Sequence, residues 1–370
     1  MPVVQASDIE GNALQSGESG WHAIACRILS DYADAETGRP HESIPDSAWD
    51  RLRAMKIDGL FRAADPRSGL LQSAYARIEA MQQASAAEAV QALLARDVTP
   101  LAFKGVDLTP RYFADGSPSA MNDIDLLVKR DEIGRARTAL LGLGFRQAYF
   151  DETRGALVDA DIADIADVER MHYELYPFRR ILPIDFEPAV AAELRASPAK
   201  QPLVFDDDGG AWLVDEIDLH HSVALDVDPQ PLFARARMSV VPGALALDAA
   251  DHLWLITSRC YNEVALHGKR SLRDFAYIVG ILRHESVDWS RVLAVASEYE
   301  MRPALYYYLR FADSLFSNRV VDPEVWSRLD PRQGSRARDW GWQLACLFDT
   351  LDAFPEWAKR PGGGHPPACP

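Results

Sequence analysis

The first hundred residues carry apolar side chains at intervals of three and four positions, the spacing that places them along one face of a helix. One such stripe comprises Trp21, Ile24, Ala25 and Leu29. A longer stripe comprises Leu71, Ala74, Tyr75, Ile78 and Met81, and continues past the small residues Ser85 and Ala89 to Leu93. The pattern predicts an N-terminal helical module over residues 1–95, whose polar, glycine-bearing first 20 residues are loose.

After residue 96 the pattern changes to short apolar or alternating runs between turn-forming residues, which is typical of strands. Four runs have this character: residues 100–103, 124–128, 182–186 and 211–219. Residues 107–113 have a helical pattern with Pro110 near its start, and Asp131 can cap a second helix that ends near Gly144. The alternation of strands and helices predicts a small mixed β-sheet in an α+β or mixed α/β core over residues 96–230.

Helical spacing returns in the last third of the chain. It is carried by Leu253, Ile256, Tyr277, Ile278, Ile281, Val292, Val295 and Ala296, and then by residues 306–315. We therefore expect a C-terminal helical module over residues 231–350. Residues 351–370 are rich in glycine and proline, and such a segment buries too little apolar area to order itself, which predicts a flexible tail.

Composition excludes several classes of function. The chain has 370 residues, of which 48% are hydrophobic and 25% charged, and its formal net charge is -16. Negative charge spread along the chain repels phosphate backbones and anionic lipid, so we expect neither a nucleic acid nor a membrane as partner. The four cysteines lack paired spacing, and neither a signal sequence nor a long apolar span is evident. These features favour a cytoplasmic protein.

The most informative motif is Asp123-Ile124-Asp125 at the start of an apolar run. Successive strand side chains alternate between faces, so Asp123 and Asp125 point the same way while Ile124 packs beneath them. Two carboxylates about 4 Å apart repel by roughly 4 kcal/mol at an effective dielectric constant near 20. A bound divalent cation that also contacts substrate phosphates commonly offsets such repulsion. Mg²⁺ favours one or two carboxylates together with phosphate oxygens and water.

Activation of an attacking hydroxyl usually needs a further acidic group near the metal ions. Asp218, between apolar neighbours in the run 211–219, fits an acid in the centre of a sheet. Glu216 shares its face and Glu187 lies in another acidic segment, so both remain alternatives, although Pro188 ends or displaces the strand beside Glu187. His220 and His221 follow the acid and are candidates for a ligand or a general base. Adjacent strand residues face opposite ways, so only one of them could serve, and a structural role is favoured for both.

Several of these features resemble the uncharacterised nucleotidyltransferase family of the polymerase-beta-like superfamily. They are Lys104-Gly105, a helix bearing Tyr112, the Asp-Ile-Asp-Leu-Leu-Val strand, and a later strand ending in Asp-Leu-His, with Leu272-Arg273-Asp274 and Val287-Asp288-Trp289 in the helical tail. The resemblance covers residues 95–315 and implies that Asp123, Asp125 and Asp218 are catalytic metal ligands. It assigns nucleotide binding to Lys104, Gly105 and Ser119; serine stands at 119 where the superfamily commonly has arginine.

The resemblance implies transfer of a nucleoside monophosphate from a nucleoside triphosphate, with ATP the expected donor, to an acceptor, with release of pyrophosphate. Mg²⁺ or Mn²⁺ would be the cofactor. The acidic surface favours a small molecule, a peptide or a protein as acceptor. The serine at 119 leaves open an alternative, namely a non-catalytic nucleotide-binding or scaffolding protein with the same fold.

Overall fold

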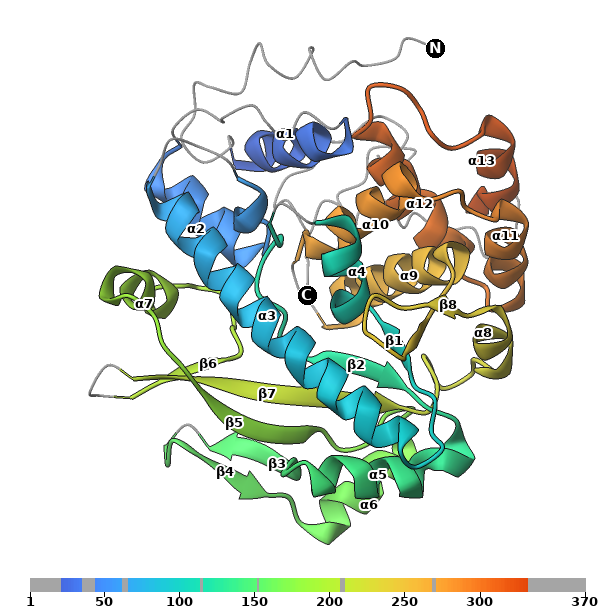
Figure 1. Ribbon diagram of the computed structural model, residues 1–370. Helices are drawn as coiled ribbons and strands as arrows, with labels where there is room; N and C mark the ends of the chain where they lie inside the picture. The colour runs from blue at the N-terminus through green and yellow to red at the C-terminus, as the bar shows by residue number, and fades with distance from the viewer. Residues whose placement is uncertain are drawn as a thin grey trace. The chain divides into compact units, whose positions relative to one another are not determined.

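The computed structural model describes residues 21–34, 44–61, 66–113, 116–151, 153–206, 210–267 and 271–331. It divides into two compact units (Figure 1). Residues 69–248 form a unit built on a β-sheet, and residues up to 68 combine with those from 249 onward in a helical unit. The predicted four-part division is finer and stays a prediction. The predicted loose start and flexible tail lie outside the described residues.

The sheet has nine strands in the described residues and is mixed in direction. The strands are β1 (Leu101–Phe103), β2 (Ile124–Leu127), β3 (Arg146–Asp151), β4 (Ala156–Asp159), β5 (Phe178–Ile184), β6 (Leu203–Phe205), β7 (Ala211–His220), β8 (Arg237–Met238) and β9 (Leu245–Ala246). Their order is β4-β3-β5-β7-β2-β1-β9-β8, and β6 also pairs with β7. The pairs β2–β7 and β1–β9 are parallel. The predicted mixed α/β class is therefore confirmed.

Strand β7 is the centre of this sheet. Strand β5 pairs with it antiparallel from Ile184, opposite Ala211, to Phe178, opposite Ile217. Along its other side β7 pairs first with β6 and then, over its C-terminal half, with β2. The C-terminal half of β7 is thus flanked by β5 and β2, which confirms the interior position predicted for the segment that contains Asp218.

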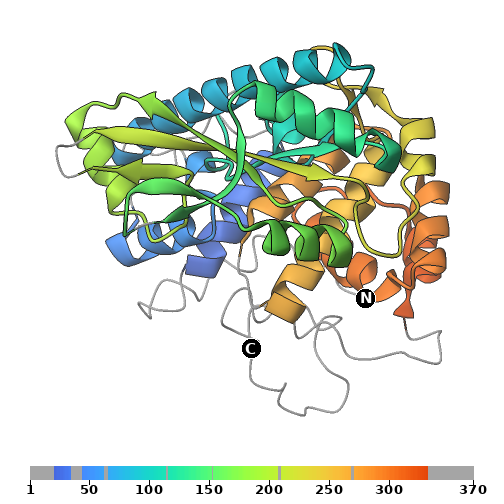
Figure 2. The ribbon, with the colours of Figure 1, turned by 90° about the horizontal axis from the view of Figure 1, so that it is seen from below.

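One face of the sheet is covered by the helices α3 (Pro66–Leu94) and α5 (Ile133–Gly142) (Figures 1 and 2). Ile124, Leu126, Ile217 and Leu219 pack in this core against apolar residues of both helices. Because side chains alternate along a strand, Asp125 and Asp218 point to the opposite face. Helix α5 ends at Gly142, close to the predicted end near Gly144. Gly144 follows with a positive φ of 84°, which allows Phe145 N–H to donate to Leu140 O (3.2 Å).

The helix α4 (Gly105–Tyr112) follows β1 directly and contains Pro110 in its interior. Proline has no N–H to donate to the carbonyl four residues earlier, which is that of Val106. The side chain of Gln83 on α3 donates to this carbonyl instead (2.8 Å). This bond offsets the loss and ties α4 to α3.

The remaining elements of this unit are the 3-10 helix η4 (Arg130–Glu132) and the helices α6 (Ile162–Met171), α7 (Pro188–Arg195) and α8 (Gln230–Arg235). The prediction that Asp131 caps a helix is wrong, because Asp131 lies inside η4. The carboxylate of Glu132 accepts from Lys129 N–H (3.1 Å) and thereby caps the start of η4. The predicted strand 182–186 begins earlier and stops at Ile184, since the chain turns there toward Pro188 at the start of α7.

The helical unit combines both ends of the chain. It contains α1 (Trp21–Ala33), α2 (Asp46–Ala54), η3 (Asp58–Leu60), α9 (Ala249–His267), α10 (Arg273–His284), α11 (Trp289–Glu298), α12 (Arg302–Ser314) and α13 (Pro323–Leu329). Helix α1 packs on α10, where Arg283 donates to Tyr32 O (2.6 Å). Leu272 N–H donates to Met55 O (2.8 Å). None of the described helices combines the length and apolar character that a bilayer-spanning segment needs.

Candidate metal centre

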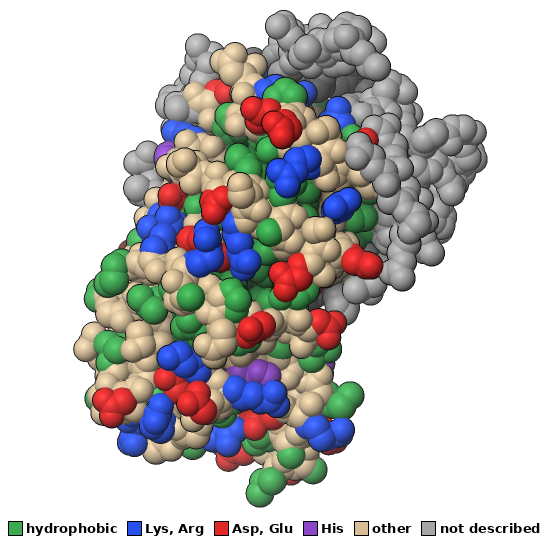
Figure 3. Space-filling model, turned by 90° about the vertical axis from the view of Figure 1, so that its right-hand side faces the viewer, with side chains coloured by type: hydrophobic (Ala, Val, Ile, Leu, Met, Phe, Trp, Pro, Cys, Tyr) green, Lys and Arg blue, Asp and Glu red, His purple; other side chains and the backbone are tan. Residues whose placement is uncertain are grey.

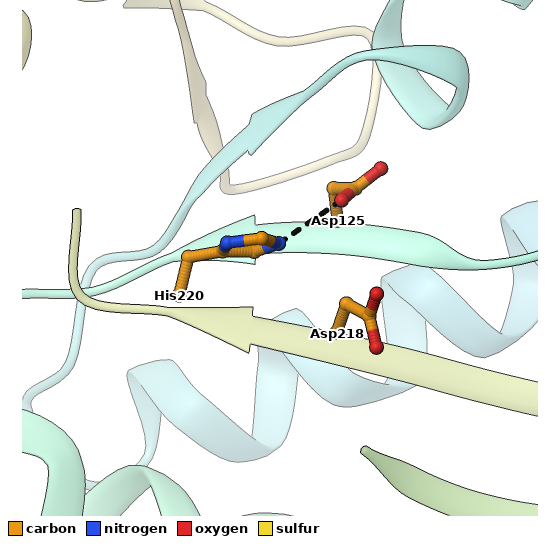
Figure 4. Close-up of side chains that lie close together, drawn as sticks. All are labelled: Asp125, Asp218 and His220. Carbon is orange, nitrogen blue, oxygen red and sulfur yellow. Dashed lines mark hydrogen bonds and ion pairs between the residues drawn. The ribbon is translucent and has the colours of Figure 1, made fainter. Parts of the chain in front are cut away.

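Two of the three predicted acids meet in register on neighbouring strands. Asp125 of β2 is paired directly with Asp218 of β7, and the two strands run parallel. Paired residues of adjacent strands lie about 5 Å apart and point to the same face. Figure 4 shows the two carboxylates rising side by side from the sheet. The alternation rule therefore identified the correct face for both residues.

His220 completes this group. It lies two residues after Asp218 on β7 and so shares its face, and its Nε2 is 3.0 Å from Asp125 Oδ1. Ligand atoms of Asp125, Asp218 and His220 all lie within 4.8 Å of one another (Figure 4). From the sequence, a ligand role was considered for one of His220 and His221, but a structural role was favoured for both. The signal was available, because residues 218 and 220 alternate onto the same side of a strand.

The electrostatics of Asp218 show strong repulsion in the group. Its Oδ1 is buried and finds no hydrogen-bond donor among the described residues. Burial raises the pKa of Asp218 well above its usual value. The negative charges of Asp123, Asp125 and Glu216 raise this pKa further, while Lys104 lowers it. An ionised Asp218 is therefore unfavourable here unless additional positive charge is supplied.

Lys104 supplies part of that charge. It is buried, and its Nζ contacts Asp125 Oδ1, the same oxygen that His220 approaches. The ammonium group also lies over the Phe103 ring, 5.0 Å from its centroid. Lys104 has φ 57° and ψ -138°, a backbone conformation that costs a non-glycine residue on the order of 1–3 kcal/mol. The turn from β1 into α4 is thus held in a strained form that directs this amine at the acids.

The other predicted site residues occupy less central positions. Asp123 lies just before β2, and its charge has the largest effect on Asp218 of any single residue. Gly105 is the first residue of α4. Ser119 is buried in the loop before β2, where its Oγ lies 3.5 Å from Ala120 O and its carbonyl accepts from Ser117 (2.7 Å). These hydrogen bonds of Ser119 are local, and its assignment to nucleotide binding stays a prediction.

The alternatives for the third acid differ in their surroundings. Glu216 shares the face of Asp218, but its carboxylate accepts from Arg179 Nε (2.5 Å) and is engaged in this ion pair. Glu187 follows the end of β5, where Ile184 is paired with Ala211. That pair is seven positions from Asp218 along β7, roughly 23 Å at about 3.3 Å per residue. Asp218 is therefore the acid that the fold brings against Asp125.

The donor set fits a divalent cation. Two carboxylates and one imidazole nitrogen converge, one buried carboxylate oxygen has no donor among the described residues, and the local charge is negative. Burial lowers the pKa of His220, although its hydrogen bond with Asp125 acts in the other direction. The imidazole is therefore neutral near pH 7, the form in which histidine binds metals.

Comparisons with known proteins agree with this geometry. Residues 46–317 match a family described as uncharacterised nucleotidyltransferases. The match covers well over half of the 370 residues and includes every strand of the described sheet. Searches of curated proteins and of solved structures found no match. The chain therefore belongs to the uncharacterised nucleotidyltransferase family, the one that its sequence resembles.

Proposed function

We propose that this protein is a divalent-metal-dependent nucleotidyltransferase. It transfers a nucleoside monophosphate from a nucleoside triphosphate, with ATP the expected donor, to a hydroxyl or similar group of a small molecule, peptide or protein, and pyrophosphate leaves. The observation that carries the proposal is the in-register pair Asp125 and Asp218, with a buried carboxylate oxygen that lacks a donor in the described part of the chain.

In this proposal Asp123, Asp125 and Asp218 hold Mg²⁺ or Mn²⁺. A bound divalent ion supplies charge to the triphosphate oxygens and lowers the pKa of the acceptor hydroxyl. Asp125 and Asp218 lie on the two central strands and Asp123 directly precedes β2, so packing of Ile124 and Ile217 in the core below fixes the spacing of the strand acids. A rigid sheet is well suited to this task, because such chemistry depends on positioning and electrostatic stabilisation.

The strand-to-helix turn beside the acids suits the triphosphate. Helix α4 begins at Gly105, and the N-terminus of a helix presents backbone N–H groups that bind phosphate. Lys104 precedes it and adds a full positive charge at the same end. We therefore assign the β- and γ-phosphates to this turn, and Gly105 would permit their close approach to the backbone.

The acceptor is proposed from charge. The net charge is -16, and the face drawn in Figure 3 has acidic and basic side chains interspersed, without a broad basic patch. A nucleic acid needs clustered lysine and arginine to neutralise its phosphates. A small molecule, a peptide or a protein side chain is therefore the acceptor class that we propose.

Two observations favour a second candidate, a nucleotide-binding protein without transferase activity. Serine occupies position 119, and Lys104 already neutralises Asp125 through a buried ion pair. A protein of this kind would bind a triphosphate and its metal ion without cleaving the α–β phosphate bond.

Pyrophosphate release distinguishes the two candidates. The full chain is incubated with each nucleoside triphosphate, Mg²⁺ or Mn²⁺, and a panel of hydroxyl-bearing small molecules, peptides and proteins. We expect release with at least one donor and acceptor, and a loss of about 100-fold or more in Asp125→Asn and Asp218→Asn, since each removes charge needed at the transition state.

Glu187→Gln is the matched control, because this acid lies in the same unit but far from the group along the sheet. Its activity should equal that of the wild type. Metal-dependent triphosphate binding without pyrophosphate release across the panel would establish the second candidate. Undiminished release by both aspartate variants would contradict the metal-ligand assignment.

A further inference from the structure

We propose that His220 contributes its Nε2 as a metal ligand, that Glu174 positions the imidazole for this role, and that the site consequently prefers Mn²⁺ to Mg²⁺. The inference rests on the proposed function, because it concerns the ion at the same acids. It adds a nitrogen ligand and a metal preference, neither of which follows from the three aspartates.

The first support is the direction of the imidazole. His220 is 1% exposed, and its Nε2 faces Asp125 Oδ1 at 3.0 Å rather than turning away from the acids. The three ligand atoms lie within 4.8 Å of one another. Figure 4 shows the ring edge aimed at the space beside the two carboxylates. A cation bound between them would therefore meet a ring nitrogen.

The second support is the environment that fixes the ring. Tyr173 stacks on the imidazole, with centroids 5.8 Å apart and planes 19° apart. Phe103 contacts it edge-on, with centroids 5.0 Å apart. Both neighbours restrict rotation of the ring. The imidazole is therefore preorganised, which lowers the entropy cost of metal binding.

The third support is a carboxylate behind the ring. Glu174 forms an isolated antiparallel bridge with His220, and its Oε2 lies 3.6 Å from Nδ1. Nδ1 is buried without a hydrogen-bond partner among the described residues. Metal-bound histidines usually donate their second ring N–H to a carboxylate or carbonyl, which fixes the tautomer and strengthens the ligand. Glu174 stands where such an acceptor is needed.

The preference for Mn²⁺ follows from this donor set. Mg²⁺ favours sites made of oxygen atoms, whereas transition ions accept imidazole nitrogen as well. Replacing one oxygen ligand by nitrogen therefore penalises Mg²⁺ more than Mn²⁺. Glu174 increases the difference between the affinities for Mn²⁺ and Mg²⁺, because it raises the basicity of His220 Nε2.

Pulsed electron paramagnetic resonance on the full chain with bound Mn²⁺ tests the ligand directly. We expect the ¹⁴N coupling of a coordinated imidazole in the wild type and its loss in His220→Gln. His221→Gln is the matched control, because this adjacent histidine lies just beyond the end of β7 and is not among the residues whose ligand atoms converge; it should retain the coupling. The wild-type spectrum decides the question even if His220→Gln fails to fold, since absence of the coupling there overturns the proposal.

Binding titrations test the preference. His220→Gln should weaken Mn²⁺ binding by at least the roughly tenfold that loss of an outer-shell partner costs, while Mg²⁺ binding changes by less than about threefold. Glu174→Ala should weaken Mn²⁺ binding more than Glu174→Gln, whose amide oxygen still accepts, at an unchanged melting temperature. Equal losses for both ions in His220→Gln would overturn the preference.

The outcomes for the two proposals are separable. Pyrophosphate release that requires Asp218, combined with Mn²⁺ lacking ¹⁴N coupling, would leave the transferase proposal standing and overturn the role of His220. An intact coupling in a protein that releases no pyrophosphate would support His220 as a ligand and contradict the transferase.

Discussion

Asp125 and Asp218 are paired in register, yet the charge around them differs: a positive group contacts Asp125, and mainly negative groups surround Asp218. Asp125 contacts a buried ammonium group and an imidazole. Asp218 instead meets mainly burial and neighbouring negative charges, and its pKa is raised as a result. The metal-free fold stabilises the negative charge of Asp125 and destabilises that of Asp218. Replacing each aspartate by asparagine should therefore change the free energy of unfolding in opposite directions.

In metal-free protein at pH 8, we expect Asp218→Asn to increase the free energy of unfolding by about 1 kcal/mol, because the substitution removes a repelled charge. Asp125→Asn should decrease it by about 3 kcal/mol, because Lys104 would be left as a buried cation without its partner. Urea denaturation with a chelator present measures both values. Destabilisation of similar size in the two variants would contradict this assignment of charges.

At the residue scale, alternation along a strand was enough to predict the face of Asp125 and Asp218. It could not predict their partners, because the pairing of β2 with β7 joins residues far apart in the sequence. Lys104 was expected to contact phosphate, and its contact with Asp125 depends on the positive φ of the turn before α4. A positive φ is uncommon for lysine, and no pattern of residue types in the sequence predicts it.

At the scale of elements, a buried polar network holds α3 on the central strand. Asp215 of β7 is fully buried on the helix-covered face and accepts from Ser85 of α3 (2.6 Å) and from Arg180 of β5 (2.8 Å). Arg180 also pairs with Glu88 of α3 (2.7 Å). These contacts fix the position of the helix relative to the strand that carries Asp218.

Ser85→Ala should destabilise the protein by about 2 kcal/mol, because it removes a hydrogen bond to a buried charged group and leaves Asp215 less satisfied. Ser73→Ala is the control, since Ser73 lies exposed on the same helix and alanine favours helix there. Chemical denaturation of both variants provides the measurement. Equal stabilities would show that the network contributes little.

Glu79 on α3 gives the protein a pH dependence. Burial raises the pKa of Glu79 to about 7. A carboxyl whose folded pKa lies above its unfolded value stabilises the fold below the unfolded pKa, and this contribution is lost as the pH rises through the folded pKa. Between pH 5 and pH 8 we therefore expect the free energy of unfolding of the wild type to fall by on the order of 2 kcal/mol relative to that of Glu79→Gln.

Chemical denaturation at both pH values measures this difference. Asp164→Asn, at an exposed position, is the control. Parallel pH profiles of stability for the wild type and Glu79→Gln would contradict the prediction.

The elements that could be predicted from the sequence are those whose side chains are largely buried, because burial requires a regular pattern of apolar residues. β1, β2 and β7 are largely buried and were found near their observed bounds, as was the long helix α3. β3 and β4 form an edge hairpin whose residues are mostly exposed or partly exposed. The alternation of apolar and polar residues in β3 and β4 is correspondingly weak, and neither strand was predicted. The strands β8 and β9 have two residues each, which is too few to show an alternation.

At the scale of the whole molecule, the two ends of the chain share one helical unit. The sequence predicted separate helical modules at each end, because periodicity reports which face of a helix is buried and not what covers it. The docking of α1 on α10 joins segments about 250 residues apart. Such a pairing depends on complementary shape and on single contacts, such as the one between Arg283 and Tyr32.

Leu29→Ala tests whether the ends of the chain depend on each other. Leu29 on α1 is fully buried, and removal of its side chain should cost about 2–5 kcal/mol. Within the helical unit, hydrogen exchange of the α10 amides should accelerate, because α10 loses the helix that covers it. Exchange in β5 and β7 should change less, since these strands belong to the other compact unit. Unchanged protection of α10 in a destabilised variant would show that the C-terminal helices hold together without the N-terminal ones.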